Sequence, residues 1–481
     1  MHPAPEPSNP KATRRRPPAA DRSARLLDWL AKSGARFPAL SLHTAPDGER
    51  LVRATRDIAP GETVLAVPRR CLITHDAVRA SAAGKALRAA GVEIEKGQLP
   101  LAAYLIAHER AGRGPFNAYV RALPAAFPGV PLFYDEAQLA LLRGTHTLRR
   151  TQQRWAEIES DHLLLREVPG FEDLDRLTLA RARTAVTSRV FGLRMGGTKR
   201  EALAPLADMM NHSASPGVDW EFDDASGEMR MIAVEPIARG AEVHDSYGEK
   251  SNARFLVAYG FTMPDNPDDE TSIPLSLAKD QPRYSEKARL LRASGGAEQR
   301  LPISLRLSDP STQKALSFLR IACASESELQ QAASTLAAAR LVPPLSARNE
   351  SAAITGLGFV CGRALSRYRE TIADDDALLA RADLPPRDRL CITVRRDEKR
   401  VLARHVELSR ALVPLLRLPR AALEREVTAR FESDAPIDRA LESVVRSLPD
   451  PSAARTLTGT LDTPDARTRS TVRPAEGRRA W

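Results

Sequence analysis

The stretch PLADMMNHS, Pro205 to Ser213, places an Asp, an Asn and a His between runs of apolar residues. A carboxylate, an amide and an imidazole exposed together are typical of a site for a metal ion or a small polar ligand. Two histidines and a carboxylate can hold iron, and a second His-Asp pair follows at 244–245. Residues 211–213 are more typical of a turn than of one helical face, so we expect no metal ion. A buried turn in which Asp208 and Asn211 satisfy backbone donors remains the plain structural interpretation.

The regions around this stretch alternate between strand and helix patterns. Short strands joined by tight turns are expected over 40–74, where PDG and PGE are turn signals and TVLAVP is a β-rich run. Residues 76–190 carry helical apolar spacing. Strand patterns return over 217–261, where MRMIAVEPI and AEVHDSY flank a turn like a hairpin. His244 and Asp245 are expected to be exposed residues of that hairpin. The order predicts an α+β fold.

The remainder of the chain is predicted to be helical over 280–417, as an all-α C-terminal domain. Ser325 and Glu328 have the spacing of a capping box at the start of one helix. Another helix presents an apolar stripe of helical period, which consists of Leu402, Val406, Leu408, Leu412, Leu415 and Leu416.

Composition narrows the class of protein. The 481 residues are 43% hydrophobic and 27% charged, with a formal charge of +10. Such a charge bears on association and solubility and not on fold, and arginines near both ends contribute to it, so nucleic acid is not the expected partner. No run approaches the ~18 apolar residues of a membrane span. Residues 1–21 and 449–481 are predicted to be a disordered leader and tail.

The four cysteines, Cys71, Cys323, Cys361 and Cys391, are far apart in the sequence. Zinc clusters need thiolates that are paired in sequence or brought together by the fold, so no metal centre is expected from them. Scattered single cysteines are typical of a reducing compartment, and we expect a cytoplasmic protein.

Three motifs occur in a characteristic order: SRVFG at 188–192, PLADMMNHS at 205–213, and PIARGAEVHDSYGEKSNARFLVAYGF at 236–261. Together they resemble the SET-domain family, in the branch that contains the Rubisco large-subunit lysine methyltransferases and the actin-histidine methyltransferases. The segments 53–74 and 116–145 resemble the N-terminal half of that domain and the insertion inside it. The resemblance extends over residues 35–417, and the ordered set is far more specific than the NHS element alone.

The resemblance implies a SET-domain β-fold, in which small sheets are closed by a knot-like C-terminal threading. The N-terminal part of the domain would be 22–75, a helical insertion 76–185, and the C-terminal part 186–265. The helical segment 280–417 would be a substrate-binding domain that docks a folded protein. We expect a monomer.

The resemblance also implies S-adenosylmethionine as cofactor. Arg189 would meet the carboxylate of the cofactor, because its guanidinium donates two parallel hydrogen bonds. Asn211 and His212 would hold the adenine and amino-acid ends. Gly48, Glu49 and Arg50 fall where a loop of the family passes the cofactor.

Tyr247 matches the catalytic tyrosine of the family, which also borders the cofactor. Asp208, Phe191 and Tyr259 match positions that line the substrate channel. Methyl transfer is an in-line displacement, so these groups mainly orient the nucleophile. A lysine that enters an aromatic channel loses hydration, which lowers its pKa and exposes the neutral amine.

Two positions favour lysine as the target. The histidine-modifying enzymes resemble one another in an Asn and a Trp at the places that Phe191 and Ala207 hold here, and Phe191 offers an imidazole no hydrogen bond. We therefore predict a protein-lysine N-methyltransferase that acts on a non-histone protein. A protein-histidine methyltransferase is one alternative. A non-catalytic SET-like binding module is another, because Glu49, Arg50 and Leu51 stand where the family usually has Gly-x-Gly.

Overall fold

The computed structural model describes residues 19–45, 49–430, 444–446 and 448, and the chain divides into two compact units. Unit 1 comprises Met1–Glu136, Arg149–Glu249 and Leu256–Phe261, and unit 2 comprises Ala137–Leu148, Lys250–Phe255 and Thr262–Trp481. Each unit has its own cluster of buried apolar side chains.

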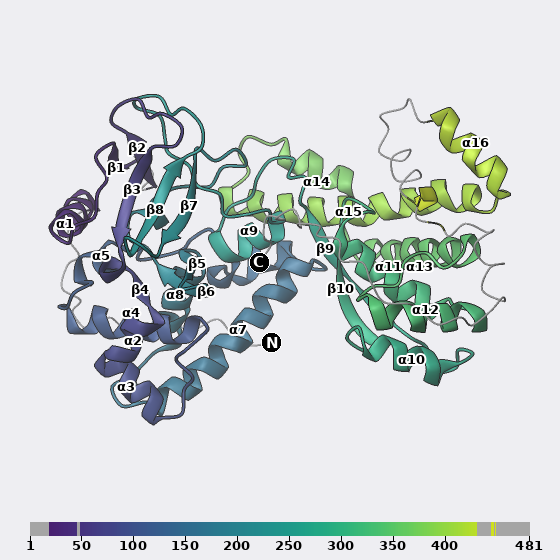
Figure 1. Ribbon diagram of the computed structural model, residues 1–481, viewed down its shortest axis with the longest axis horizontal. Coiled ribbons are helices and arrows are strands. Elements are labelled where there is room, and N and C mark those ends of the chain that lie inside the picture. The colour runs from purple at the N-terminus through teal and green to yellow at the C-terminus, as the bar shows by residue number, and fades with distance from the viewer. Residues whose placement is uncertain (1–18, 46–48, 431–443, 447, 449–481) are drawn as a thin grey trace, which may run out of the picture. The chain divides into compact units, whose positions relative to one another are not determined.

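Three small antiparallel sheets form the β part of unit 1 (Figure 1). In the first, β1 (Leu40–Thr44) pairs with β2 (Arg50–Ala54). The second has the order β3–β8–β7, with β3 at Thr63–Pro68, β8 at Glu228–Ala233 and β7 at Val218–Asp223. The third has the order β4–β6–β5, with β4 at Ile73–Thr74, β6 at Thr198–Leu203 and β5 at Val190–Met195. Strands that precede the helical stretch thus pair with strands that follow it, which confirms the predicted fold class.

The expected hairpin between MRMIAVEPI and AEVHDSY is wrong. Strand β8 pairs with β3 and β7. The second segment runs elsewhere: Val243 donates its N–H to the carbonyl of Val52 at 2.8 Å, and Asp245 donates to the carbonyl of Asn211 at 2.9 Å. Asp245 is therefore only 3% exposed. Alternation in a sequence indicates which residues form strands, but it does not say which strand is the partner.

Helices fill the interval between β4 and β5. They are α2 (His75–Ala80), α3 (Ala82–Ala89), α4 (Gln98–Ala111), α5 (Asn117–Ala122) and α8 (Arg176–Thr187), all in unit 1. Helices α6 (Glu136–Leu141), α7 (His146–Arg166) and α9 (Asn252–Tyr259) each contain residues of both units. Within the described part of the chain, none of the helices has the length and hydrophobicity that a bilayer crossing requires.

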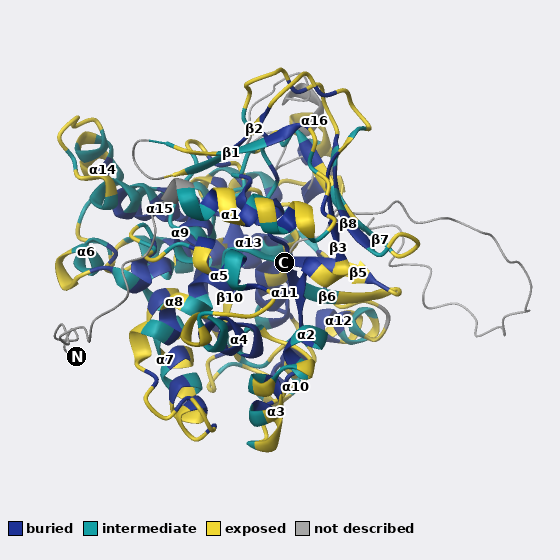
Figure 2. Ribbon diagram, turned by 90° about the vertical axis from the view of Figure 1, so that its left-hand side faces the viewer, coloured by how far each residue is buried: buried dark blue, intermediate teal, exposed yellow. Residues whose placement is uncertain are grey.

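The predicted disordered leader ends earlier than expected, because α1 spans Ala19–Lys32. Asp21 lies in its first turn, where a negative charge stabilises the helix dipole, and pairs with Arg25 at 3.0 Å. One side of α1 is buried and the other exposed, as Figure 2 shows. Residues 1–18 and the predicted tail, 449–481, lie outside the described residues.

Unit 2 is mainly helical, but the prediction of an all-α C-terminal domain missed a two-stranded sheet. Strand β9 (Glu270–Ser276) pairs with β10 (Glu298–Ser304). Pro302 interrupts the β pattern of the second strand, and a proline is tolerated there because the sheet has only edge strands. The helices of unit 2 are α10 (Tyr284–Arg292), α11 (Pro310–Ala322), α12 (Glu326–Ala338), α13 (Ala347–Leu365), α14 (Ile372–Leu379), α15 (Pro386–Leu416) and α16 (Arg420–Arg430).

Two local predictions for this unit are confirmed. Ser325 and Glu328 form a reciprocal capping box at the start of α12. Of the predicted stripe on α15, Leu402, Leu408, Leu412 and Leu416 are each at most 3% exposed, and they pack in the core of unit 2.

Asp269 should make the stability of unit 2 depend on pH. Burial and the neighbouring Asp397 raise the pKa of Asp269 to about 8, although its carboxylate accepts the N–H of Asn252 at 2.7 Å. Glu398 acts in the same direction as Asp397, and Arg396 opposes it.

Because the pKa of Asp269 is higher in the folded chain, its contribution to stability is full below about pH 4 and is lost as the pH rises through 8. The melting temperature should therefore fall between about pH 5 and pH 9. Asp269→Asn, which keeps an acceptor for Asn252, should flatten this dependence in thermal unfolding. An equally steep decline in the variant would assign the dependence to other groups.

Candidate active site

A pocket of about 690 Å³ lies within unit 1. Short segments from several parts of the sequence line it: Arg22, Ser23, Thr44, Glu49, Arg50, Ala122, Leu123, Pro124, Ala125, Ala126, Phe127, Pro128, Gly129, Ser188, Arg189, Asp208, Met209, Asn211, His212, Tyr247, Tyr259, Gly260 and Phe261. Its volume is in the range of pockets that hold small molecules and cofactors, roughly 300–1,000 Å³. Arg189, Asn211 and Tyr247, the three central residues of the sequence prediction, all border it.

Arg189 and Asp208 form a buried ion pair on one side of the pocket. Nη1 of Arg189 lies 3.3 Å from Oδ2 of Asp208 and donates to its backbone carbonyl at 2.7 Å. Burial raises the pKa of Asp208, and the charge of Arg189 opposes that rise. Among the described residues, Nε of Arg189 and Oδ1 of Asp208 have no hydrogen-bond partner although both atoms are buried. The side chain of Arg189 is 15% exposed and that of Asp208 is 0% exposed, so of this pair only Arg189 is open to a ligand in the pocket.

Asn211 follows a short 3-10 turn, Ala207–Met209. Its carboxamide nitrogen lies 2.9 Å from Oε1 of Glu242 and 3.2 Å from both Oε1 of Glu49 and the carbonyl of Arg50. These contacts fix the orientation of the Asn211 amide in the absence of a ligand.

A hydrogen bond from the backbone of Tyr247 joins it to the ring of His212. The N–H of Tyr247 donates to Nδ1 of His212 at 3.1 Å, so Nδ1 is the acceptor nitrogen of the ring. The hydroxyl of Tyr247 donates to the carbonyl of Met210 at 2.9 Å. Burial raises the pKa of Tyr247, which keeps this hydroxyl protonated at neutral pH.

An aromatic wall continues from this pair. The rings of Tyr247 and Tyr259 are stacked with centroids 4.6 Å apart, and those of His212 and Tyr247 are stacked at 5.2 Å. Phe261 lies 6.0 Å from both Tyr259 and His212. Phe261 was not among the predicted site residues, although the YGF motif contains it.

The segment that replaces Gly-x-Gly is compatible with the pocket. Glu49 and Arg50 border it, whereas Leu51 pairs with His43 in the β1–β2 sheet and is not one of its lining residues. Neither Glu49 nor Leu51 has a positive φ, so the backbone here does not require glycine. Gly48 lies outside the described residues.

The side chain of Arg50 reaches the helical insertion. Its guanidinium donates to the carbonyl of Ala122 at 2.5 Å, and burial together with the nearby Arg189 lowers the pKa of Arg50 to about 10.

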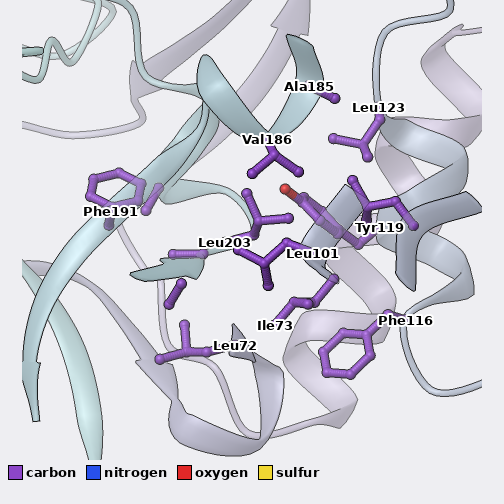
Figure 3. Packing of buried hydrophobic residues seen from close by; sticks show 14 of the residues in the cluster. Leu72, Ile73, Leu101, Phe116, Tyr119, Leu123, Ala185, Val186, Phe191 and Leu203 are labelled. Carbon is purple, nitrogen blue, oxygen red and sulfur yellow. The ribbon is translucent and has the colours of Figure 1, made fainter. Parts of the chain in front are cut away.

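Phe191 is the predicted site residue that the structure does not bring to this pocket. It lies on β5, is 9% exposed, and contacts the ring of Trp220 edge-on at 5.5 Å. Figure 3 shows it as part of the buried cluster that also contains Leu72 and Leu203. Arg189 precedes β5, so strand alternation does not relate its side chain to that of Phe191. The spacing alone therefore did not reveal that Phe191 packs in the apolar core.

A pair of glycines joins two walls of the pocket. A Cβ on Gly129 would lie 2.1 Å from the carbonyl oxygen of Gly260, and a Cβ on Gly260 would lie 2.8 Å from the carbonyl carbon of Gly129. Gly260 also has a φ of +86°. The loop 123–129 of the insertion therefore contacts the segment 259–261 backbone to backbone, at Gly129 and Gly260. The sequence prediction included this loop in the insertion segment 116–145 but assigned no site residue to it, and its only signal was the density of Pro and Gly.

In the described ranges, no group of three His, Cys, Asp or Glu side chains has the arrangement of a metal site. The His-Asp pair at 244–245 has other partners. Nε2 of His244 lies 3.6 Å from Oε1 of Glu242. Oδ1 of Asp245 accepts the N–H of Ser246 at 2.7 Å.

Comparison with known proteins identifies the class of protein. Residues 49–248 match the SET domain, and residues 278–402 match the Rubisco LSMT substrate-binding domain. The chain is therefore a SET-domain protein with a Rubisco LSMT substrate-binding domain, and it belongs to the S-adenosylmethionine-dependent protein methyltransferases of the SET type.

Among individual proteins, the chain is similar to actin-histidine N-methyltransferases. The human protein is 26% identical over 442 residues, which cover 87% of this chain and 71% of that protein. The dog protein is 27% identical over 456 residues, which cover 90% and 74%. The SET domain of LSMT bound to lysine and AdoHcy has the same fold, with a TM-score of 0.71 at 21% identity over 89% of this chain and 99% of that one. Rubisco LSMT bound to AdoMet superposes with a TM-score of 0.69 at 20% identity, covering 88% and 99%.

Proposed function

We propose that this chain transfers a methyl group from S-adenosylmethionine to the side-chain amine of a lysine in a non-histone protein. The observation that carries the proposal is the meeting of Arg189, Asn211 and Tyr247 at one pocket, from segments far apart in the sequence. SET-domain methyltransferases use this cofactor, and the similar Rubisco LSMT has been seen with AdoMet bound.

The residues present fit the cofactor. Its amino-acid end carries a carboxylate and an ammonium, and the pocket offers the guanidinium of Arg189 for the first and the carboxylate of Glu49 for the second. Asn211 and His212 would hold the remaining polar edges, and the aromatic wall would face the sulfonium through its π electrons. When bound, S-adenosylmethionine supplies an electrophilic methyl group on a positively charged sulfur.

Tyr247 orients the nucleophile and does not serve as a base. Its raised pKa keeps the proton on the hydroxyl, and that proton is donated to the carbonyl of Met210. A phenol oxygen that donates still has lone pairs that accept an N–H, which can fix the direction of the target amine. The stacked rings of Tyr259 and Tyr247 exclude water, so an amine entering here is favoured in its neutral, nucleophilic form.

Lysine rather than histidine is proposed because of two side chains. Phe191 is packed in the core and Ala207 is 1% exposed, so neither presents a polar group to an imidazole. Histidine is the second candidate, since the similar actin-histidine N-methyltransferases cover most of the chain.

Incubation of the full chain with methyl-labelled S-adenosylmethionine and a cell lysate tests both candidates, lysine and histidine methylation. Tandem mass spectrometry of the labelled proteins should find the label on lysine. Label on histidine would replace the lysine proposal by the second candidate. Absence of labelled protein in any fraction, with intact donor, would count against transferase activity.

Asn211→Ala should weaken binding of the donor. The change removes the amide that lies between Glu49 and Glu242 and leaves two carboxylates facing one another. We expect the Kd for S-adenosylmethionine to rise by roughly 10- to 100-fold, the equivalent of about 1–3 kcal/mol. Calorimetric titration measures this, and Asn117→Ala, in α5 away from the pocket lining, provides a control with the same change. An unchanged Kd in Asn211→Ala would remove Asn211 from the binding site.

A further inference from the structure

We propose that Glu242 is a positioning residue that makes Asn211 present its carbonyl oxygen to the pocket, and thereby selects a donor that carries an ammonium group. The inference rests on the proposed function, whose donor has an ammonium at its amino-acid end. Asn211 lines the pocket and Glu242 does not. Glu242 therefore acts through Asn211.

The carboxamide nitrogen of Asn211 is surrounded by acceptors. Its Nδ2 lies 2.9 Å from Oε1 of Glu242, and 3.2 Å from both Oε1 of Glu49 and the carbonyl oxygen of Arg50. An ionised carboxylate and a carbonyl can only accept a hydrogen bond. The nitrogen of the amide, and not its oxygen, must therefore face these three groups.

The oxygen of the same amide is left open. Oδ1 of Asn211 accepts no hydrogen bond from the described residues, and it is not fully buried. Because Asn211 lines the pocket and its nitrogen is engaged, the oxygen is the polar atom of this side chain that remains for a ligand. It can only accept, and at the amino-acid end of the donor the ammonium carries the N–H groups that it needs.

The chain around Glu242 fixes its carboxylate beside this amide. Glu242 forms an antiparallel bridge with Arg53 of β2. Asp245, further along the same segment, donates its N–H to the carbonyl of Asn211 at 2.9 Å. The side chain of Glu242 is 21% exposed, and Nε2 of His244 lies 3.6 Å from the oxygen that accepts from Asn211. The segment is thus bonded both to β2 and to Asn211 itself.

Glu242 matters most when the donor is bound. Glu49 borders the pocket, and its carboxylate is the group proposed to meet the ammonium. Once it does so, the two hydrogens of the Asn211 amide have Glu242 and the carbonyl of Arg50 as their acceptors. Without Glu242, one N–H loses its partner or the amide turns its nitrogen toward the pocket. A nitrogen there donates where the ammonium also donates, so the ammonium loses an acceptor.

A pair of ligands that differ only in the ammonium measures this selection. S-adenosylhomocysteine carries the group, and its deaminated analogue has a hydrogen atom in that place. In calorimetric titration, the wild-type chain should bind the first roughly 100-fold more tightly than the second, and Glu242→Ala should lower this ratio to roughly tenfold.

Three further variants separate the positioning role from a general loss of structure. Glu242→Gln keeps an acceptor oxygen for Nδ2 and should retain the wild-type ratio. Glu242→Met keeps the length of the side chain without an acceptor and should behave like Glu242→Ala. Glu235→Ala removes an exposed glutamate outside the pocket lining and should change nothing.

The amide can also be followed without any ligand. In protein labelled with ¹⁵N at asparagine, the side-chain signal that is lost in Asn211→Ala identifies Asn211. Its protons should exchange with water faster in Glu242→Ala and Glu242→Met than in the wild type, and at the wild-type rate in Glu242→Gln and Glu235→Ala. Unchanged exchange in the first two variants, or an unchanged preference for the ammonium ligand, would overturn the positioning role.

The outcomes distinguish the role of Glu242 from the transferase activity. A chain that methylates protein but keeps its preference for the ammonium in Glu242→Ala would support the activity and overturn the role. A chain whose preference depends on Glu242 but that transfers no methyl group would support the role and refute the activity. A wild-type chain that binds neither ligand would refute both.

Discussion

Replacing Tyr247 by phenylalanine should lower kcat for methyl transfer by about 100-fold while the Kd of the donor changes little. The ring, its stacking on Tyr259 and the backbone bond to His212 all persist in this variant. Only the hydroxyl is lost, and with it the group that directs the target amine. Single-turnover rates with labelled S-adenosylmethionine measure the loss.

The control for this experiment is Tyr104→Phe, which removes the hydroxyl of a buried tyrosine outside the pocket lining and should leave turnover unchanged. Full turnover in Tyr247→Phe, with normal donor binding, would refute the role assigned to the hydroxyl. A loss that is confined to donor affinity would make Tyr247 a binding residue only.

Gly260→Ala should have the second large effect, on stability and on activity together. The new methyl group would require a residue with a side chain to keep a φ of +86° and would lie 2.8 Å from the backbone of Gly129. The first cost is on the order of 1–3 kcal/mol, and relief of the clash must move the loop 123–129 away from the aromatic wall. We expect a lower melting temperature and at least a tenfold lower kcat/KM.

Gly240→Ala separates these two causes. Gly240 has nearly the same φ, +82°, but a Cβ there would meet nothing within 4 Å. It should therefore show the loss of stability from backbone strain without the loss of activity. Equal activity in the two variants would show that the contact between Gly129 and Gly260 does not shape the pocket.

The order of motifs in the sequence was sufficient to predict the fold class, because each motif belongs to a strand or turn that the fold requires. The pairing between strands was harder to predict from the sequence. Segment 241–245 alternates like a hairpin strand, yet it lies beside β2 and the turn at Asn211. Strand β10 was missed because Pro302 disrupts its pattern. Both errors concern contacts between distant segments, which local periodicity does not encode.

The pocket was predictable where a motif names the residue, as for Arg189, Asn211 and Tyr247. It was not predictable where the contact comes from the insertion. The hydroxyl of Tyr119 donates to Oδ2 of Asp208 at 2.6 Å, although Tyr119 lies 89 residues away, inside a helix without any polar signal. Gly129 and Gly260 are likewise distant in sequence, and only the structure shows their backbones in contact.

Phe191 shows that a motif can identify a position without revealing which way its side chain points. Its place after Arg189 suggested a substrate contact, whereas its side chain packs against Trp220. Lysine is consequently favoured by the absence of a polar side chain at this position and not by a contact from the phenyl ring.

Titration of S-adenosylmethionine into the full chain by calorimetry tests whether the three distant segments that carry Arg189, Asn211 and Tyr247 build one donor site. We expect saturable binding of one donor per chain, weakened by Asn211→Ala and retained in Tyr247→Phe. The absence of any binding heat at near-millimolar donor, in folded protein, would contradict it and favour a SET-like module without catalytic activity.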